Sequence, residues 1–271
     1  GDRDPGAGEG GFLMSRRQEW LRDYGATGPC PGVRMVCFPH AGGTASAYAA
    51  WRDGLAGGVE DVELVAVRYP AREDRLLDPP VPSLRAMARM VAADLENLHA
   101  EKSLPLVLFG HSMGGSIAHE VAVLLRGAGL PVVLLLVSAR LPAAALTPGR
   151  HQPDEELAAM LCDMDPGTGE VLNDPELREL VWPAIRADHD ATNRYHGHRL
   201  PRLDVPIVAL GGHGDDRVDP KALSSWKECT DAEFRISLFE GGHFYYREDL
   251  ERFLSIVSVH VSGAVAAFSR G

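Results

Sequence analysis

The chain has 271 residues, of which 45% are hydrophobic and 24% are charged, an ordinary composition for a globular protein. Its formal net charge of −11 argues against nucleic acid as the main partner, because phosphate binding draws on clustered Lys and Arg. The same charge argues against an anionic membrane surface, and no apolar run approaches the length of a transmembrane helix. The length suffices for one large α/β domain or two small ones.

The cysteines and the N-terminal segment indicate the cellular compartment. Cys30, Cys37, Cys162 and Cys229 lie far apart and form no C-x-x-C pair, so neither a zinc site nor a disulfide framework is indicated. No basic segment followed by an apolar core opens the sequence, so we expect no secretory signal and a cytoplasmic protein with reduced thiols. Residues 1–13 are Gly-rich and charged and are expected to be disordered.

The first clear strand is Val33–Phe38, and segment 15–23 predicts a short helix before it. The strand runs into Pro39-His40-Ala41-Gly42-Gly43. A glycine pair after an early strand lets backbone N–H groups turn inward, and an oxyanion hole needs such donors where negative charge develops. The Ala41 N–H is the candidate donor. His40 is interpreted as structural, without a role in proton transfer.

A helix over Ser46–Leu55 and a strand over Val62–Tyr69 follow. The charged loop at 70–75 is interpreted as a solvated surface. The next segment, Ser83–His99, predicts an amphipathic helix with Ser83 as its N-cap. The expected core face of that helix consists of Leu84, Met87, Met90, Val91 and Leu95.

The sequence LPLVLFGHSMGGS begins as an apolar strand and ends in a G-x-S-x-G motif centred on Ser112. Helical spacing follows to about Gly127, so the motif lies between a strand and a helix, as a nucleophile elbow requires. Ser112 is therefore the candidate nucleophile, and the Met113 N–H is the second candidate oxyanion donor. The alternative is a Gly-rich strand-to-helix turn with an ordinary capping serine.

A further buried strand is predicted over Pro131–Ser138. Val- and Leu-rich strands that alternate with helices indicate a parallel sheet covered on both faces. The pattern then breaks, and three helical pieces are expected in the region before residue 200: Glu155–Cys162, Pro175–Leu180 and Trp182–His196. We therefore divide the chain into an N-terminal flexible segment with a short helix (1–30), a core (31–140 and 200–271) and a helical lid insertion (141–199). A fixed helical elaboration is the alternative to a lid.

The strand pattern returns at Val205–Leu210 and again at Phe234–Phe239, and a closing helix is expected over Glu248–Phe268. Asp215 follows the first of these strands, and His243 follows the second in a Gly-rich loop. Because parallel strands end at one edge of a sheet, both side chains should lie beside the elbow.

The order Ser112, Asp215, His243 is that of an α/β-hydrolase triad. His243 would take the serine proton and return it to the leaving group, while Asp215 would orient the imidazole ring. Asp216 and Asp219 are the rival acids. The remaining histidines lack metal-ligand spacing, so no metal site is expected.

Five motifs together resemble the type II thioesterases of polyketide synthase and nonribosomal peptide synthetase pathways. They are VCFPHAGGTASAY (36–48), VRYPAREDRL (67–76), FGHSMGGSIAHEVA (109–122), IRADHDATNRY (185–195) and GGHFYYRED (241–249). The resemblance extends from about Val33 to the last helix and implies an α/β-hydrolase fold. Ala71 stands where the family usually has Gly. The family commonly has Asp three residues before Val, which favours Asp215.

The resemblance implies an editing thioesterase that hydrolyses stalled or wrongly primed acyl groups from the phosphopantetheine arm of acyl or peptidyl carrier proteins. It implies no cofactor, and a monomer is the default expectation. The alternatives are a general esterase or lipase, an acyltransferase, and a catalytically silent relative that binds an acyl ligand or a synthase subunit. Fold alone does not choose among them.

Overall fold

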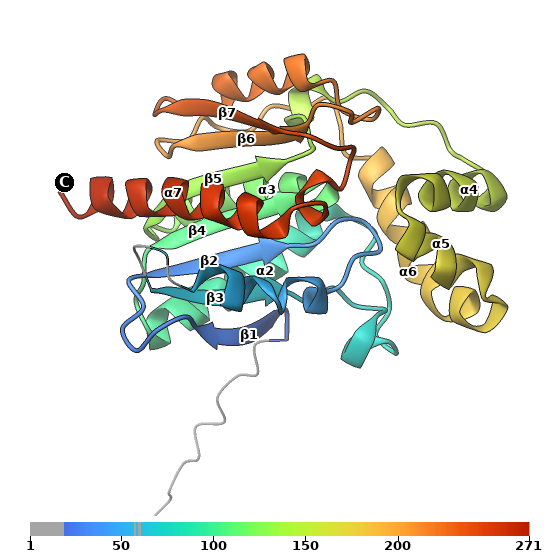
Figure 1. The fold of residues 1–271 in the computed structure, drawn as a ribbon, viewed down its shortest axis with the longest axis horizontal. Helices are drawn as coiled ribbons and strands as arrows, with labels where there is room; N and C mark the ends of the chain where they lie inside the picture. The colour runs from blue at the N-terminus through green and yellow to red at the C-terminus, as the bar shows by residue number, and fades with distance from the viewer. Residues whose placement is uncertain (1–18, 57, 59–60, 271) are drawn as a thin grey trace, which may run out of the picture.

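A central sheet of seven strands organises the computed structural model, which describes residues 19–56, 58 and 61–270 (Figure 1). The strand order is β1-β3-β2-β4-β5-β6-β7, and only β1 runs antiparallel to its neighbour. The strands are β1 (Leu21–Ala26), β2 (Val33–Phe38), β3 (Val62–Val67), β4 (Leu106–His111), β5 (Val132–Ser138), β6 (Ile207–Gly212) and β7 (Phe234–Phe239). The expected mostly parallel sheet is confirmed, and the predicted disorder of residues 1–13 lies outside the described residues.

Helices cover both faces of the sheet. The α-helices are α1 (Trp51–Leu55), α2 (Leu84–Glu101), α3 (Met113–Gly127), α4 (Asp154–Met164), α5 (Pro166–Asn173), α6 (Pro175–Asn193) and α7 (Leu250–Phe268). The residues of α2 and α3 pack with one face of the sheet, and those of α1 and α7 pack with the other. Every residue of strands β2 to β6 is buried as a result, which is the physical reason for their predominantly apolar sequences.

The insertion forms a separate helical layer beyond the carboxyl ends of the strands. Figure 1 shows α4, α5 and α6 beside the arrowheads of the parallel strands. These three helices share a small apolar cluster of their own: Leu157, Ala158, Leu161, Leu172 and Ile185. The layer therefore lies where the predicted site residues were expected.

The N-terminal part of the described chain differs from the prediction. Residues 21–26 form strand β1 at the sheet edge, not part of a short helix. Trp20 is buried beside this strand, and its amide donates to Asp94 Oδ2 at 2.8 Å. The prediction was wrong because pairing with β3, about forty residues later in the chain, is a tertiary contact that a local pattern does not contain.

Several predicted helices form with different bounds. The 46–55 segment divides into a 3₁₀ turn (Ala45–Tyr48) and the short α1. The two pieces predicted over 175–196 are one helix, α6, that continues through Pro183, and α5 was not predicted. Ser83 caps α2 as expected, but Met90 is 45% exposed and does not belong to the core face of α2.

Helix α7 meets the length and composition of a membrane-spanning helix, contrary to the expectation that no segment would. It is the one such helix among the described residues, and a third of its most apolar window is buried. The buried face, which includes Phe253, Leu254 and Val257, packs on the sheet. A core helix of a globular protein passes the same test, so length and composition do not distinguish the two cases.

We expect the aromatic cluster around Trp51 to dominate the stability of the α1–α7 face. Trp51 is 1% exposed and its ring lies 4.8 to 5.8 Å from four other aromatic rings, those of Tyr48, Phe109, Tyr246 and Phe253. Trp51→Ala should lower the free energy of unfolding by about 3–5 kcal/mol, measured by denaturant titration. Val259→Ala, at a position that is 71% exposed on α7, is the control and should change it by about 0.5 kcal/mol or less.

Candidate active site

The predicted nucleophile lies on a tight turn between β4 and α3. Ser112 has φ 52° and ψ −120°, a conformation that residues with a Cβ atom avoid. Its amide donates to the Ser138 carbonyl at 2.8 Å, and its carbonyl accepts from the Gly115 amide at 2.9 Å. The turn is thus fixed from both sides, and the half-buried serine side chain faces a cavity.

The motif glycines are required by close backbone packing. A Cβ atom on Gly114 would overlap the carbonyl groups of Phe38 and Pro39, and one on Gly110 would overlap the backbone of Gly114 and Gly115. Only glycine lets the backbones approach this closely. The start of α3 therefore rests directly on the loop that follows β2, which brings two predicted parts of the site together.

The loops that follow β6 and β7 are joined by backbone hydrogen bonds. His213 N donates to Phe239 O at 2.8 Å, and Gly214 N donates to Gly241 O at 2.9 Å. Gly241 has φ +109°, a value that favours glycine, and the chain turns there toward His243. The pairing of the two loops sets the distance between Asp215 and His243.

Asp215 contacts His243 directly. Asp215 Oδ2 lies 3.0 Å from His243 Nδ1, and both side chains are buried. The other carboxylate oxygen accepts from the amides of Arg217 (2.9 Å) and Val218 (3.3 Å). The carboxylate is thereby held in one orientation against the imidazole ring.

The surroundings of Asp215 favour its ionised form. Burial would raise the pKa of its carboxyl group, but the hydrogen bond and charge of His243 and the amides of Arg217 and Val218 outweigh burial. The pKa of Asp215 therefore lies below its ordinary value, and the carboxylate is ionised at neutral pH. An ionised acid is the form that orients an imidazole and stabilises its protonated state.

The rival acids are placed elsewhere. Asp216 is exposed, and Asp219 caps the 3₁₀ helix Pro220–Cys229 by accepting from the Lys221 amide at 2.9 Å. Of the three carboxylates that follow β6, the structure brings Asp215 to His243.

Two backbone amides beside Ser112 are free to bind an anion. Met113 is the first residue of α3, where helical N–H groups have no intrahelical acceptor. Ala41 lines the same cavity as Ser112, and no acceptor for its amide is present in the part of the chain that the structure describes. One predicted oxyanion donor thus directly follows Ser112 and the other lines the same cavity, and the roles of all three residues stay a prediction.

The site cavity is small, with a volume of about 70 Å³. Ser112, His243, Ala41 and Phe244 contribute its core side. The insertion contributes Leu161, Met164, Asp165, Thr168, Ile185 and His189. The core and the insertion therefore build the cavity together, and the insertion supplies three apolar and three polar residues to its wall.

His40 is a partly buried wall residue of this cavity. Its ring packs edge-on against Phe244, with the ring centroids 4.9 Å apart. Burial, assisted by the charge of Arg247, lowers the pKa of His40 to about 3. The imidazole is therefore neutral at physiological pH, which agrees with the structural role expected for it.

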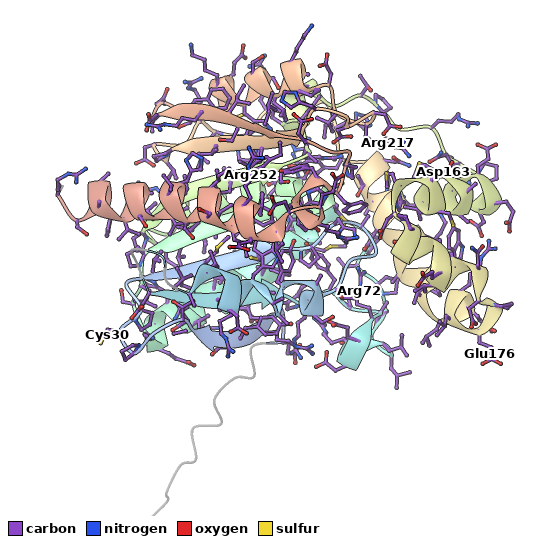
Figure 2. The ribbon with its side chains drawn as sticks, viewed as in Figure 1. Cys30, Arg72, Asp163, Glu176, Arg217 and Arg252 are labelled. Carbon is purple, nitrogen blue, oxygen red and sulfur yellow. The ribbon has the colours of Figure 1, made fainter. Side chains whose placement is uncertain are left out.

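The interpretation of loop 70–75 as a solvated surface was wrong for Arg72, although Asp74 is exposed as expected. Arg72 is 7% exposed and pairs at 2.7 Å with Asp188 of α6, which is fully buried. Figure 2 shows Arg72 between the sheet and the insertion helices. A run of charged residues is expected to be solvent-exposed unless a partner for its charges is known. The partner of Arg72 lies 116 residues further along the chain, so the sequence pattern did not indicate it.

Ala71 adopts a conformation that explains the family preference at this position. Its φ is 64°, in the left-handed region where glycine has no steric penalty. The alanine therefore keeps the backbone shape of the loop at some cost in local strain.

A second ion pair joins the insertion to the core at the edge of the cavity. Asp165, which caps α5, lies 2.9 Å from Arg247 Nη1, and Thr168 Oγ1 donates to the same carboxylate at 2.7 Å. The guanidinium group of Arg247 lies over the Phe244 ring, 4.2 Å from its centroid. This contact closes the space between α5 and the segment that follows His243.

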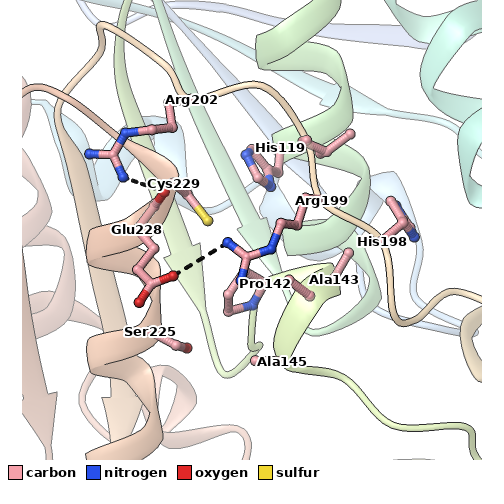
Figure 3. A pocket seen from close by; sticks show the side chains of 12 residues that line it. His119, Pro142, Ala143, Ala145, His198, Arg199, Arg202, Ser225, Glu228 and Cys229 are labelled. Atoms are coloured by element: carbon pink, nitrogen blue, oxygen red, sulfur yellow. Dashed lines mark hydrogen bonds and ion pairs between the residues drawn. The ribbon is translucent and has the colours of Figure 1, made fainter.

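A larger cavity, of about 460 Å³, lies away from the predicted residues (Figure 3). Its walls are the segment after β5 (142–145), the segment 198–202 and the 3₁₀ helix Pro220–Cys229, with His119 of α3. Arg199 and Glu228 form an ion pair across it at 3.5 Å. Size therefore does not identify the site; the placement of Ser112 and His243 does.

His119 should make stability pH-dependent. It is 2% exposed, and burial, with a smaller effect of His198, lowers the pKa of His119 to about 4. Below its ordinary value of about 6.5, the unfolded chain binds a proton that the folded chain does not, so stability is lost as pH falls. Between pH 7.5 and pH 5, the free energy of unfolding of His119→Phe should therefore fall by about 2 kcal/mol less than that of the wild type.

Urea titrations at several pH values measure this difference. Ser225→Ala, in the same cavity but without a titratable group, is the control and should keep the wild-type pH dependence. An unchanged pH dependence in His119→Phe would contradict this prediction, because it would show that the pKa of His119 is the same in the folded and unfolded states.

Known proteins resemble this chain over most of its length. A thioesterase-domain family model matches residues 33–260. Thioesterase PikA5 of Streptomyces venezuelae is 34% identical over 246 residues, which are 89% of this chain and 85% of that protein.

Two solved structures share the fold. The type II thioesterase BorB from the borrelidin biosynthetic cluster superposes with a TM-score of 0.79 at 36% identity, over 89% of this chain and 97% of that chain. The thioesterase RedJ from the prodiginine pathway of Streptomyces coelicolor gives a TM-score of 0.75 at 30% identity, over 85% of this chain and 86% of that chain. These similarities confirm the α/β-hydrolase fold class. The chain therefore belongs to the thioesterase family, among the type II thioesterases of polyketide and nonribosomal peptide pathways, which are serine hydrolases that act on thioesters.

Proposed function

We propose that this thioesterase edits biosynthesis by hydrolysing aberrant or stalled acyl groups from the phosphopantetheine arm of acyl or peptidyl carrier proteins. The observation that carries the proposal is the meeting of Ser112 and the Asp215–His243 pair at one small cavity whose lining includes Leu161, Met164 and Ile185 of the insertion. A thioester suits such a site, because its carbonyl is electrophilic and a thiolate leaves readily.

The reaction proceeds through an acyl-enzyme. Because His243 Nδ1 faces Asp215, Nε2 is the atom that takes the proton as Ser112 Oγ attacks the thioester carbon. The C–S bond then breaks, and the proton passes from Nε2 to the departing pantetheine thiol. In the second half, His243 deprotonates a water that attacks the acyl-serine, and Ser112 Oγ leaves with that proton.

The amides of Met113 and Ala41 stabilise the tetrahedral oxyanion in both halves of the reaction. They are backbone donors on fixed elements, so no reorganisation is needed when charge develops. Ionised Asp215 stabilises the imidazolium that forms at the same time.

The insertion (141–199) serves as a lid over the acyl group. It supplies the apolar side chains Leu161, Met164 and Ile185 opposite Ser112. The Asp165–Arg247 ion pair lies where the lid meets the core, and opening the lid on this side would break it.

The proposed partner is an acyl or peptidyl carrier protein, and the proposed setting is the cytoplasm, with the enzyme as a monomer. Carrier proteins are usually acidic, and this chain has a net charge of −11, so overall charge opposes association. Docking would therefore use a local apolar or basic patch.

Intact-protein mass spectrometry of an acyl-loaded carrier protein tests this function. Wild type should remove the acyl mass rapidly, and Ser112→Ala should be slower by about three orders of magnitude or more, because it lacks the nucleophile. A p-nitrophenyl ester of the same acid is the parallel substrate. Fast ester cleavage with an untouched carrier thioester would indicate a general esterase, and no turnover of either substrate would indicate a binding protein.

The paired variants Asp215→Asn and Asp216→Asn test the assignment of the acid. Asp215→Asn removes the charge that faces His243 Nδ1 and should lower kcat about 10³- to 10⁴-fold. Asp216→Asn changes an exposed side chain one residue away and should stay within about twofold of wild type. Equal losses in steady-state kinetics would contradict the assignment.

A further inference from the structure

We propose that Arg72 and Asp188 are positioning residues that hold the loop after β2 in the conformation that presents the Ala41 amide to the oxyanion. The inference rests on the proposed function, because it assigns this loop to the oxyanion hole. It also implies that α6 of the insertion is part of the catalytic framework.

One carboxylate oxygen of Asp188 makes both of the contacts that define this arrangement. Asp188 Oδ2 accepts from the Gly42 amide at 2.8 Å and from Arg72 Nη1 at 2.7 Å. The same Arg72 nitrogen donates to the Gly43 carbonyl at 3.1 Å. The ion pair therefore holds the two residues that directly follow Ala41, one by its N–H and one by its C=O.

The rest of the loop is held by other partners. Tyr48 Oη donates to the Phe38 carbonyl and Tyr69 Oη donates to the Pro39 carbonyl, each at 3.2 Å. Within the loop itself, the Gly43 amide donates to the His40 carbonyl at 2.9 Å. In contrast, the Ala41 amide has no acceptor among the described residues. Fixing the neighbours while leaving one donor free is the arrangement that a preorganised anion site needs.

The remaining contacts of Arg72 bring in the loop that follows β3. Arg72 Nε donates to the Pro70 carbonyl at 3.1 Å, and the guanidinium group lies over the Tyr69 ring, 5.3 Å from its centroid. Ile185, one helical turn before Asp188, lies so close to Gly42 that a Cβ atom there would meet Ile185 Cγ1 at 2.8 Å. The loop is thus enclosed by α6 on one side and by the 69–72 segment on the other.

Stability alone is a poor reason for this ion pair. A buried pair pays a large desolvation penalty, and apolar residues of similar volume would often stabilise the fold as well or better. What apolar residues could not do is accept from the Gly42 amide and donate to the Gly43 carbonyl. The pair is therefore explained by the geometry it imposes on the loop.

Two substitutions of Asp188 separate its contacts. Asp188→Asn keeps an oxygen for the Gly42 amide but loses the charge that faces Arg72, whereas Asp188→Leu loses both. Misplacing an oxyanion donor costs about 10²-fold in rate. We expect kcat to fall about 10-fold in Asp188→Asn and about 100-fold in Asp188→Leu, with little change in KM. Arg72→Met, which leaves Asp188 to hold Gly42 alone, should resemble Asp188→Asn.

The chain offers a matched control at the opposite ends of the same strands. Arg34 of β2 and Glu63 of β3 form another buried ion pair, 2.5 Å between Nε and Oε1, far from Ser112 in the sheet. Glu63→Gln should lower thermal stability as the Asp188 variants do. It should nevertheless keep wild-type kcat at temperatures well below its melting point.

A tetrahedral mimic distinguishes positioning from a general loss of structure. An alkyl boronic acid adds to Ser112 Oγ and places an oxygen in the oxyanion hole, whereas an acyl-pantetheine thioether mimics only bound substrate. The boronic acid should lose affinity in parallel with kcat, and the thioether should keep its affinity.

The outcomes decide the proposal as follows. Wild-type kcat in folded Asp188→Leu, a loss of kcat in Glu63→Gln equal to that in the Asp188 variants, or equal weakening of both inhibitors would overturn it. Ser112→Ala keeps this test separate from the proposed function. If Ser112→Ala is inactive while Asp188→Leu is fully active, only the positioning role fails; if Ser112→Ala is active, the proposed mechanism fails.

Discussion

The positive φ of Ser112 is the constraint on which the rest of this site depends. A serine in this conformation is stable only where its surroundings over-determine it. The turn directly follows β4, and the Ser138 carbonyl of β5 accepts a hydrogen bond from the Ser112 amide. Gly114, which has no Cβ atom, lets the start of α3 pack against the carbonyl groups of Phe38 and Pro39. The conformation of Ser112, the free Met113 amide and the position of the loop that carries Ala41 are consequences of one backbone packing arrangement.

The buried charged side chains around this site occur in pairs. The ionised Asp215 carboxylate faces His243, and Arg72 forms an ion pair with Asp188, while His40 is neutral because burial lowers its pKa to about 3. Buried charge is expensive unless it is paired and hydrogen-bonded, so each of these pairs marks a place where geometry matters. One pair orients the proposed base, and the other fixes the loop that carries the proposed oxyanion donor.

The two contacts between the insertion and the core differ in character. The Arg72–Asp188 pair is buried and shares its hydrogen bonds with the backbone of the loop. The Asp165–Arg247 pair is partly exposed and lies at the edge of the cavity. An exposed pair contributes little free energy and breaks readily. If the insertion opens, α4 and α5 are therefore better suited to move than α6, which is fixed to the loop after β2.

By itself, the sequence determined the parallel sheet, the elbow at Ser112 and the positions of Asp215 and His243 after their strands. These features are local: buried strands read as apolar runs, and the ends of parallel strands meet at one edge whatever the rest of the chain does. It did not determine that residues 21–26 pair with β3, that Asp215 and not Asp216 faces His243, or that Arg72 is buried. Each of these depends on a partner that only the folded chain supplies. The motifs around Arg72 and Asp188 were both recognised in the sequence. Their contact could not be predicted, because the two residues are 116 positions apart and only the folded chain brings their charges together.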